Sequence, residues 1–188
     1  MGKPITNVVG FDDAPFAHDH RGRVRIVGVV CARTRLDGVV SGFVSRDGTN
    51  STARIVQLIR DSQFAHYIRA VLLQGIALAG FNVVDVVRLH ETLEVPVLVV
   101  VRRPPRLGLV KVALFGHTRG AAHKWKLIER AGEVERLGPI YAQRVGIDRE
   151  GALDLLRATT LHGNVPEPLR LAHLIAGGIT TGASRGRV

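Results

Sequence analysis

The stretch TNVVGFDDAPF, from Thr6 to Phe16, decides the fold. Its apolar residues are typical of a β-strand, which delivers two adjacent carboxylates, Asp12 and Asp13, just before Pro15 ends it. Side chains alternate between the two faces of a strand, so these carboxylates cannot both point inward. An ionised carboxylate is costly to bury unless it is paired or bound to a cation. The stretch therefore indicates either a site for a hard cation such as Mg²⁺ or an aspartate-capped turn.

Length and composition indicate a single globular domain spanning residues 1–188. The chain is 46% hydrophobic, and none of its apolar runs reaches the 18 or so residues of a membrane span. Cys31 is the single cysteine, which excludes an intrachain disulfide and a cysteine-based zinc site. The N-terminus has no signal-peptide pattern, so we expect a cytoplasmic protein without a membrane partner.

The charge of the chain is strongly positive and unevenly distributed. The formal net charge is +10, and residues 101–188 hold 15 basic and 7 acidic side chains against 11 and 9 in residues 1–100. Arginine accounts for 22 of the 26 basic residues. Because guanidinium groups bind phosphate bidentately, the chain is expected to bind a polyanion, with DNA preferred and RNA as the alternative. An arginine-rich surface selected for other reasons is the competing interpretation.

The order of predicted elements indicates a mixed α/β sheet. β-branched runs at 24–31 and 39–44 flank Asp37-Gly38, which predicts a hairpin turn, and a helix follows from residue 51. An apolar run at 70–77, a helix at 83–93 and a second apolar run at 96–101 predict two parallel strands with a crossover. Three antiparallel strands followed by strand–helix–strand is the order of a ribonuclease H-like fold. Residues 104–188 are expected to form a basic, mostly helical portion: helices at 107–115, 121–131, 149–160 and 169–179, and a strand at 139–145.

Several polar residues follow the predicted strands and have two interpretations each. Asp47 and Asp85 are either turn and helix-cap residues or further metal ligands beside Asp12, since a ribonuclease H-like fold supplies acids from these elements. Arg102 and Arg103 end a buried strand and are candidate phosphate ligands, because ligands collect at the carboxyl ends of parallel strands. His18 and His20 could ligate a metal, although a polar loop of this kind is more often simply solvated.

Four segments together resemble an archaeal family related to endonuclease V, some of whose members are called endonuclease dU. They are Val9 to Phe16 (VGFDDAPF), Gly75 to Asp85 (GIALAGFNVVD), Pro96 to Pro105 (PVLVVVRRPP) and Pro166 to Ala176 (PEPLRLAHLIA), with the tail Ser184-Arg-Gly-Arg. The resemblance runs over nearly the whole chain. It implies a ribonuclease H-like fold and a divalent-metal nuclease that acts at deoxyuridine.

Carried over by position, the resemblance assigns the first metal ligand to Asp12, with Asp47 near the second. The Asp-Gly on the fourth strand of endonuclease V corresponds to Gln74-Gly75, which lacks the carboxylate. The resemblance therefore implies that Asp85 or Asp13 completes the site, or that the chemistry is reduced. The lysine after its fifth strand corresponds to Arg102 or Arg103.

These observations lead to one principal hypothesis and two alternatives. The principal one is an endonuclease dependent on Mg²⁺ or Mn²⁺ that acts on DNA at deaminated bases. Asp12, Asp13, Asp47 and Asp85 would be its catalytic acids; Asp12, Asp47 and Asp85 would hold the metal. A displaced base would bind near Phe81 and Asn82. A nucleic-acid-binding module of reduced catalytic power and a metabolic enzyme with a small anionic substrate are the alternatives.

Overall fold

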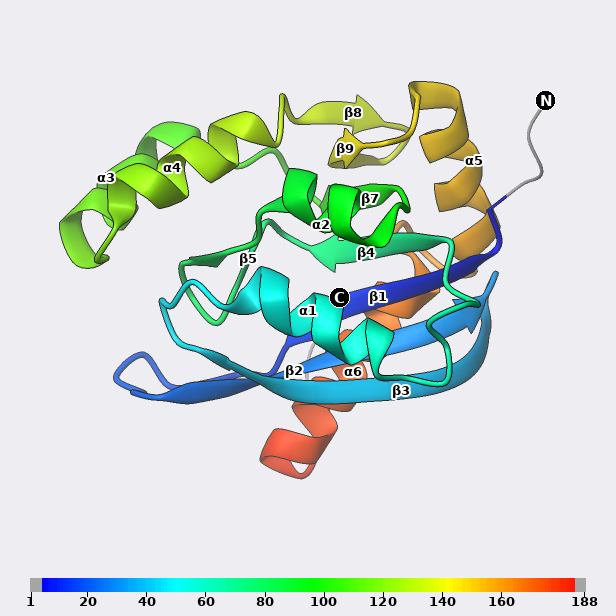
Figure 1. Ribbon diagram of the computed structural model, residues 1–188, viewed down its shortest axis with the longest axis horizontal. Coiled ribbons are helices and arrows are strands. Elements are labelled where there is room, and N and C mark those ends of the chain that lie inside the picture. The colour runs from blue at the N-terminus through cyan, green and yellow to red at the C-terminus, as the bar shows by residue number, and fades with distance from the viewer. Residues whose placement is uncertain (1–4, 185–188) are drawn as a thin grey trace.

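A computed structural model describes residues 5–184 and contains one large mixed sheet between two layers of helices (Figure 1). The strands of this sheet are β1 (Asn7–Asp13), β2 (Arg23–Ala32), β3 (Arg35–Ser45), β4 (Ala70–Gln74), β7 (Val97–Val101), β8 (Glu135–Leu137) and β9 (Ile140–Val145). They lie in the order β3-β2-β1-β4-β7-β9-β8. β1, β4 and β7 are parallel, and the other neighbouring pairs are antiparallel. The predicted order of three antiparallel strands followed by a parallel pair is confirmed.

The central strands carry apolar side chains on both faces of the sheet, so helices cover both faces. The helices are α1 (Ser51–Arg60), α2 (Val86–Leu93), α3 (Leu107–His117), α4 (Ala121–Arg130), α5 (Arg149–Thr159) and α6 (Glu167–Thr181). α1 and α2 pack on the face that carries Val9 and Phe11, and α5 and α6 pack on the face that carries Val8. α3 and α4 project from one end of the sheet (Figure 1). Within the part of the chain that the structure describes, no helix is long and apolar enough to cross a bilayer.

The hairpin between β2 and β3 differs from its prediction. Its turn lies at Arg33 and Thr34, where Arg33 has a φ of +56°, and Asp37-Gly38 lies inside β3. The register shifts opposite Val30 and Cys31, so Asp37 occupies a β-bulge. A Cβ on Gly38 would lie 2.1 Å from the ring of Phe64, so this glycine is needed for packing and not for a turn. Asp-Gly occurs both in turns and in bulges. Here the packing of Gly38 against Phe64 favours the bulge.

The apolar run at 70–77 is also shorter as a strand than predicted. β4 ends at Gln74, and Gly75 follows with a φ of +81°. The chain then forms a small hairpin of β5 (Ala77–Leu78) and β6 (Asn82–Val83) before α2 begins. This hairpin is not signalled by polar turn residues, because Leu78 and Ala79 at its tip are themselves buried. It brings the turn Ala79–Gly80 to the carboxyl edge of the main sheet, where the acidic residues lie.

Candidate active site

The close approach of α6 to β1 builds the centre of the site. A Cβ added to Gly10 would lie 2.7 Å from Pro168 and 2.8 Å from the backbone nitrogen of Leu169. Glycine at this position therefore lets the helix pack directly against the strand. Asp12 lies on the same face of β1, two residues further along, and His173 lies one helical turn after Leu169. The two side chains consequently meet.

Asp12 is a buried carboxylate held by two hydrogen bonds. Its side chain is in contact with His173, whose Nδ1 lies 2.9 Å from Oδ2, and Oδ1 accepts a hydrogen bond of 2.9 Å from the backbone N–H of Asp13. Burial, and then the charge of Asp13, raise the pKa of Asp12 to about 6 against the opposing effect of the bond to His173. A buried acid with such a pKa is a candidate functional group.

Asp13 points to the other face of the strand and lines the same opening. Its Oδ2 accepts a hydrogen bond of 2.7 Å from the backbone N–H of Ala79, and burial raises its pKa. The opening is a cavity of about 560 Å³, which we call the acidic cavity. It is lined by Asp12, Asp13, Ala14, Pro15, Phe16, His173, Gly177 and Thr181. Both members of the predicted acidic pair are therefore at one site.

Asp47 lies on the other side of the β5–β6 hairpin from Asp13. Its backbone N–H donates to the carbonyl of Ala79 at 2.9 Å, and its Oδ1 accepts from the N–H of Phe81 at 2.7 Å. Its Oδ2 is 3.2 Å from Nε of Arg46. The side chain thus caps the hairpin turn and is neutralised by an arginine. Lys124, which is 1% exposed, donates to the Asp47 carbonyl and holds this residue in its conformation with a φ of +52°.

Asp85 is the N-cap of α2. Its Oδ1 accepts a hydrogen bond of 3.0 Å from the backbone N–H of Arg88, and its Oδ2 is 3.4 Å from Nη1 of Arg130. The structure does not bring Asp12, Asp47 and Asp85 together as the predicted metal ligands. In residues 5–184 no three His, Cys, Asp or Glu side chains form a group that could hold a metal ion. The physical reason is that turn and cap positions use the carboxylates of Asp47 and Asp85 for backbone N–H groups.

Asn82 and Phe81, predicted to bind a displaced base, have structural contacts instead. Asn82 is fully buried; its Oδ1 accepts from the N–H of Ser51 at 3.0 Å, and its Nδ2 donates to the Ser45 carbonyl at 2.8 Å. Its side chain therefore accepts from a backbone N–H at the start of α1. Phe81 packs in a separate apolar cluster with residues of β6, α3 and α4.

Arg102 and Arg103 follow β7 at the same edge of the sheet. They line a separate cavity of about 450 Å³ with Pro139, Ile140 and Asn164, which we call the arginine cavity. It shares none of its lining residues with the acidic cavity. The sequence placed these arginines at the correct edge, because the carboxyl ends of parallel strands coincide.

Gln74 ends β4 beside the end of β1. Phe11 pairs with Leu73, so Asp12 and Gln74 are the next residues on the two strands. Leu72 packs on the α6 side of the sheet, and Gln74, two residues later, faces that side as Asp12 does. Its Oε1 is buried and has no hydrogen-bond partner in the described part of the chain. An acceptor left in this state is unusual and suggests a ligand.

Comparisons with known proteins agree with this geometry. The model of a family described as endonuclease dU matches residues 4–180. The chain belongs to the endonuclease dU family. A UPF0215 protein of Deinococcus radiodurans is 50% identical over 183 residues, which cover 97% of this chain and 93% of that protein.

Solved structures show that the fold of the chain is similar to that of endonuclease V. A protein of unknown function from Archaeoglobus fulgidus has a TM-score of 0.86 and 33% identity, covering 93% of this chain and 98% of that one. Endonuclease V of Ciona intestinalis, in complex with a 24mer DNA containing an inosine, has a TM-score of 0.57 and 14% identity, covering 89% and 83%. The predicted resemblance and the endonuclease V-like, ribonuclease H-like fold are confirmed.

Sequence reasoning missed His173, which belongs to the candidate active site. It lies in the segment from Pro166 to Ala176 that carries the family resemblance, and this was the available signal. No local pattern connects it with Asp12, which is 161 residues away in the sequence. Gly177, one turn further along α6, was missed for the same reason; both line the acidic cavity.

Proposed function

We propose that the chain is a divalent-metal-dependent endonuclease that hydrolyses DNA at deaminated bases such as deoxyuridine. The observation that carries the proposal is the contact between the buried Asp12 and His173 in a cavity at the carboxyl end of β1. Membership of the endonuclease dU family supports it. The structure of the Ciona protein, solved with inosine-containing DNA, supports a nucleic-acid substrate.

The site offers oxygen ligands suited to Mg²⁺ or Mn²⁺, although it has fewer carboxylates than the sequence predicted. Such ions take oxygen ligands, keep several waters, and are commonly held by one or two carboxylates together with substrate phosphates. Asp12 and the unpartnered Oε1 of Gln74 offer two oxygens on one face of the sheet. Bound there, the ion would stabilise negative charge on the phosphate and favour ionisation of water.

His173, oriented by Asp12, would accept the proton of the attacking water. Asp12 holds the imidazole through Nδ1, which fixes the ring and leaves its other nitrogen to accept a proton. The side chain of His173 is 38% exposed, so the ring can reach substrate in the cavity. Asp13, anchored by the N–H of Ala79, lies beside Asp12, and its charge raises the pKa of Asp12.

The test is nicking of a duplex that contains one deoxyuridine. We expect cleavage with Mg²⁺ or Mn²⁺, none with EDTA, and a loss of at least about a hundredfold in kcat for His173→Ala and Asp12→Asn, the lower end of the range for one acid–base group. Asp154→Asn is the matched control, because Asp154 is an exposed acid on α5 that pairs only with Arg157. Cleavage in EDTA, or cleavage that Asp12→Asn leaves intact, contradicts the proposal.

A nucleic-acid-binding module without catalysis is the second candidate, and Gln74 favours it. An amide at this position supplies an oxygen but no negative charge, which weakens cation binding. Under this alternative the wild-type chain binds DNA without turnover, and Gln74→Asp gains metal-dependent nicking. Under the principal proposal the wild-type chain already turns over, so the two candidates are separated by one assay.

A further inference from the structure

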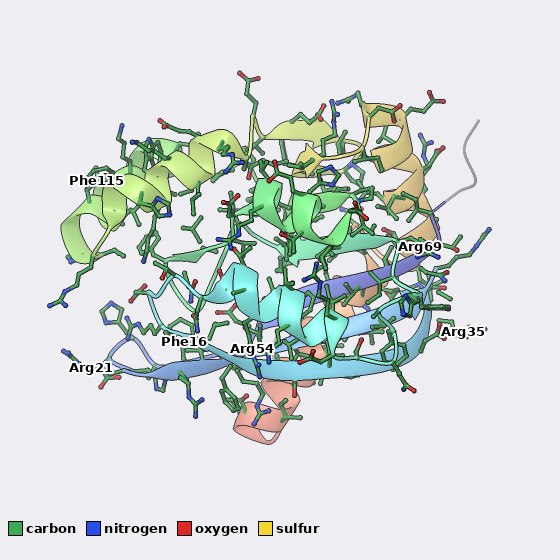
Figure 2. All side chains as sticks on the ribbon, in the orientation of Figure 1. Phe16, Arg21, Arg35, Arg54, Arg69 and Phe115 are labelled. Carbon is green, nitrogen blue, oxygen red and sulfur yellow. The ribbon has the colours of Figure 1, made fainter. Side chains whose placement is uncertain are left out.

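A third cavity, of about 610 Å³, lies at the loop between β1 and β2. We call it the loop pocket. It is lined by His18, Asp19, His20, Arg21, Gly22, Arg46, Asp47 and His117. These residues come from the β1–β2 loop, the segment after β3 and the end of α3. Figure 2 shows Arg21 at the outer end of the β1–β2 loop, at the end of the molecule where Phe115 of α3 also lies.

Arg46 organises the loop pocket. Its backbone N–H donates to the carbonyl of Gly22 at 2.8 Å, and its Nη1 donates to the carbonyl of His20. Its guanidinium carbon is 5.5 Å from the ring centre of Phe16. The loop is therefore fastened to the end of β3 before any ligand arrives. Nε of Arg46 is 3.2 Å from Oδ2 of Asp47, yet it is buried and has no hydrogen-bond partner among the described residues.

The donors of the loop pocket suit an anion better than a cation. Asp47 is occupied by the N–H of Phe81 and by Arg46, and Asp19 is the one remaining acid in the lining. Arg21 is exposed and has no ion pair among the described residues, and three imidazoles add N–H groups. No metal-holding group of three side chains occurs in this part of the chain. Guanidinium and imidazole N–H donors are suited to phosphate oxygens.

The side chain of Phe16 lies close to residues of both the acidic cavity and the loop pocket. Phe16 lines the acidic cavity, and its ring is next to Arg46 and 6.2 Å from that of His20, centre to centre; both of these line the loop pocket. A ligand that occupies both cavities is therefore expected to extend past Phe16. A polymer with regularly repeated phosphates meets this requirement, whereas a single phosphate fills only one cavity.

We propose that the loop pocket binds a backbone phosphate of the nucleic-acid strand whose neighbouring phosphodiester lies in the acidic cavity. The identification of the polymer as nucleic acid rests on the proposed function, but the phosphate chemistry of the pocket does not. Arg21 and Arg46 are the principal ligands, and His117 completes the pocket from α3.

The test measures binding in EDTA, so that it does not depend on cleavage. The probe is a fluorescent 12-nucleotide single strand, titrated at several NaCl concentrations by anisotropy. The slope of log K against log salt is negative, and removing one phosphate contact makes it less steep by about 0.7 for a single strand. We expect this change for Arg21→Gln, and a lower affinity at each salt concentration when His117→Gln is added, because an imidazole hydrogen bond to phosphate is lost. Arg35→Gln is the matched control, because Arg35 is an exposed arginine at the opposite end of the view in Figure 2.

Each outcome bears on the proposal. Equal slopes for the wild type, Arg21→Gln and Arg35→Gln overturn it. Inorganic phosphate that perturbs the His117 imidazole signals in NMR, without any change in the DNA slope, overturns the polymer assignment and leaves a small-anion site. A slope change in Arg21→Gln without nicking by the wild type supports the loop pocket and contradicts the nuclease proposal. Nicking by the wild type with unchanged slopes supports the nuclease proposal and contradicts the loop-pocket proposal.

Discussion

At the scale of a residue, burial of the ionised Asp12 carboxylate lowers the free energy of unfolding, and the proposed function gives a reason for keeping this residue. Because its pKa is about 6 in the folded chain and 3.8 in the reference state, the folded state binds the extra proton between these values. The contribution of Asp12 to the free energy of unfolding therefore falls as pH rises from about 4 to about 6, by about 3 kcal/mol, and stays lower above that.

Asp12→Asn should remove the part of the pH dependence that Asp12 contributes. The amide can still accept a hydrogen bond from His173 and carries no charge to desolvate. We expect the variant to match the wild type near pH 4 and to exceed it by up to about 3 kcal/mol at pH 7.5, as measured by urea denaturation in EDTA. Asp154→Asn, on the exposed face of α5, should follow the wild type at both pH values. Parallel curves for wild type and Asp12→Asn would show that the carboxylate is not destabilising.

At the scale of an element, the position of α6 depends on the absence of a side chain at Gly10. Gly10→Ala forces a methyl group to within 2.8 Å of the α6 backbone, and overpacking of this kind costs about 1–3 kcal/mol. We expect a lower midpoint of thermal unfolding and, because α6 carries His173, a lower kcat. Gly108→Ala is the control: it lies in helix α3 with no atom within 4 Å of its Cβ position, so it should be neutral or slightly stabilising. Equal stability of Gly10→Ala and wild type would contradict the close packing.

Elements with a strong local pattern were predictable from the sequence, and those decided by packing were not. The helix capped by Asp148 begins where predicted, since the side chain accepts from the N–H of Gly151 as an N-cap should. Asp37-Gly38 was misread because a bulge and a turn use the same residues. The β5–β6 hairpin was missed because its tip is apolar and buried. The pairing of Asp12 with His173 depends on how α6 crosses β1, which no short segment encodes.

At the scale of the whole molecule, the sheet gathers chemistry-bearing residues at one edge. The parallel strands β1, β4 and β7 end at Asp13, Gln74 and Val101. The acidic pair, Gln74 and the two arginines after β7 therefore lie at the same edge of the sheet. This part of the site was predictable from the strand order alone. Separate cavities then divide the edge into an acidic region and an arginine region.

This division predicts that binding and chemistry can be altered independently. Arg103→Gln removes a positive charge from the arginine cavity without touching the acidic cavity, so we expect weaker DNA binding and a higher KM with kcat within about threefold of wild type. Asp12→Asn should do the opposite, because it removes a negative charge from the path of the phosphates: kcat is lost while DNA binds equally well or more tightly in EDTA. Steady-state nicking and anisotropy titrations on the same proteins measure both, with Arg157→Gln on α5 as the charge-matched control. If Arg103→Gln lowers kcat and leaves KM unchanged, the arginine cavity belongs to the reacting centre. The edge would then be one site and not two.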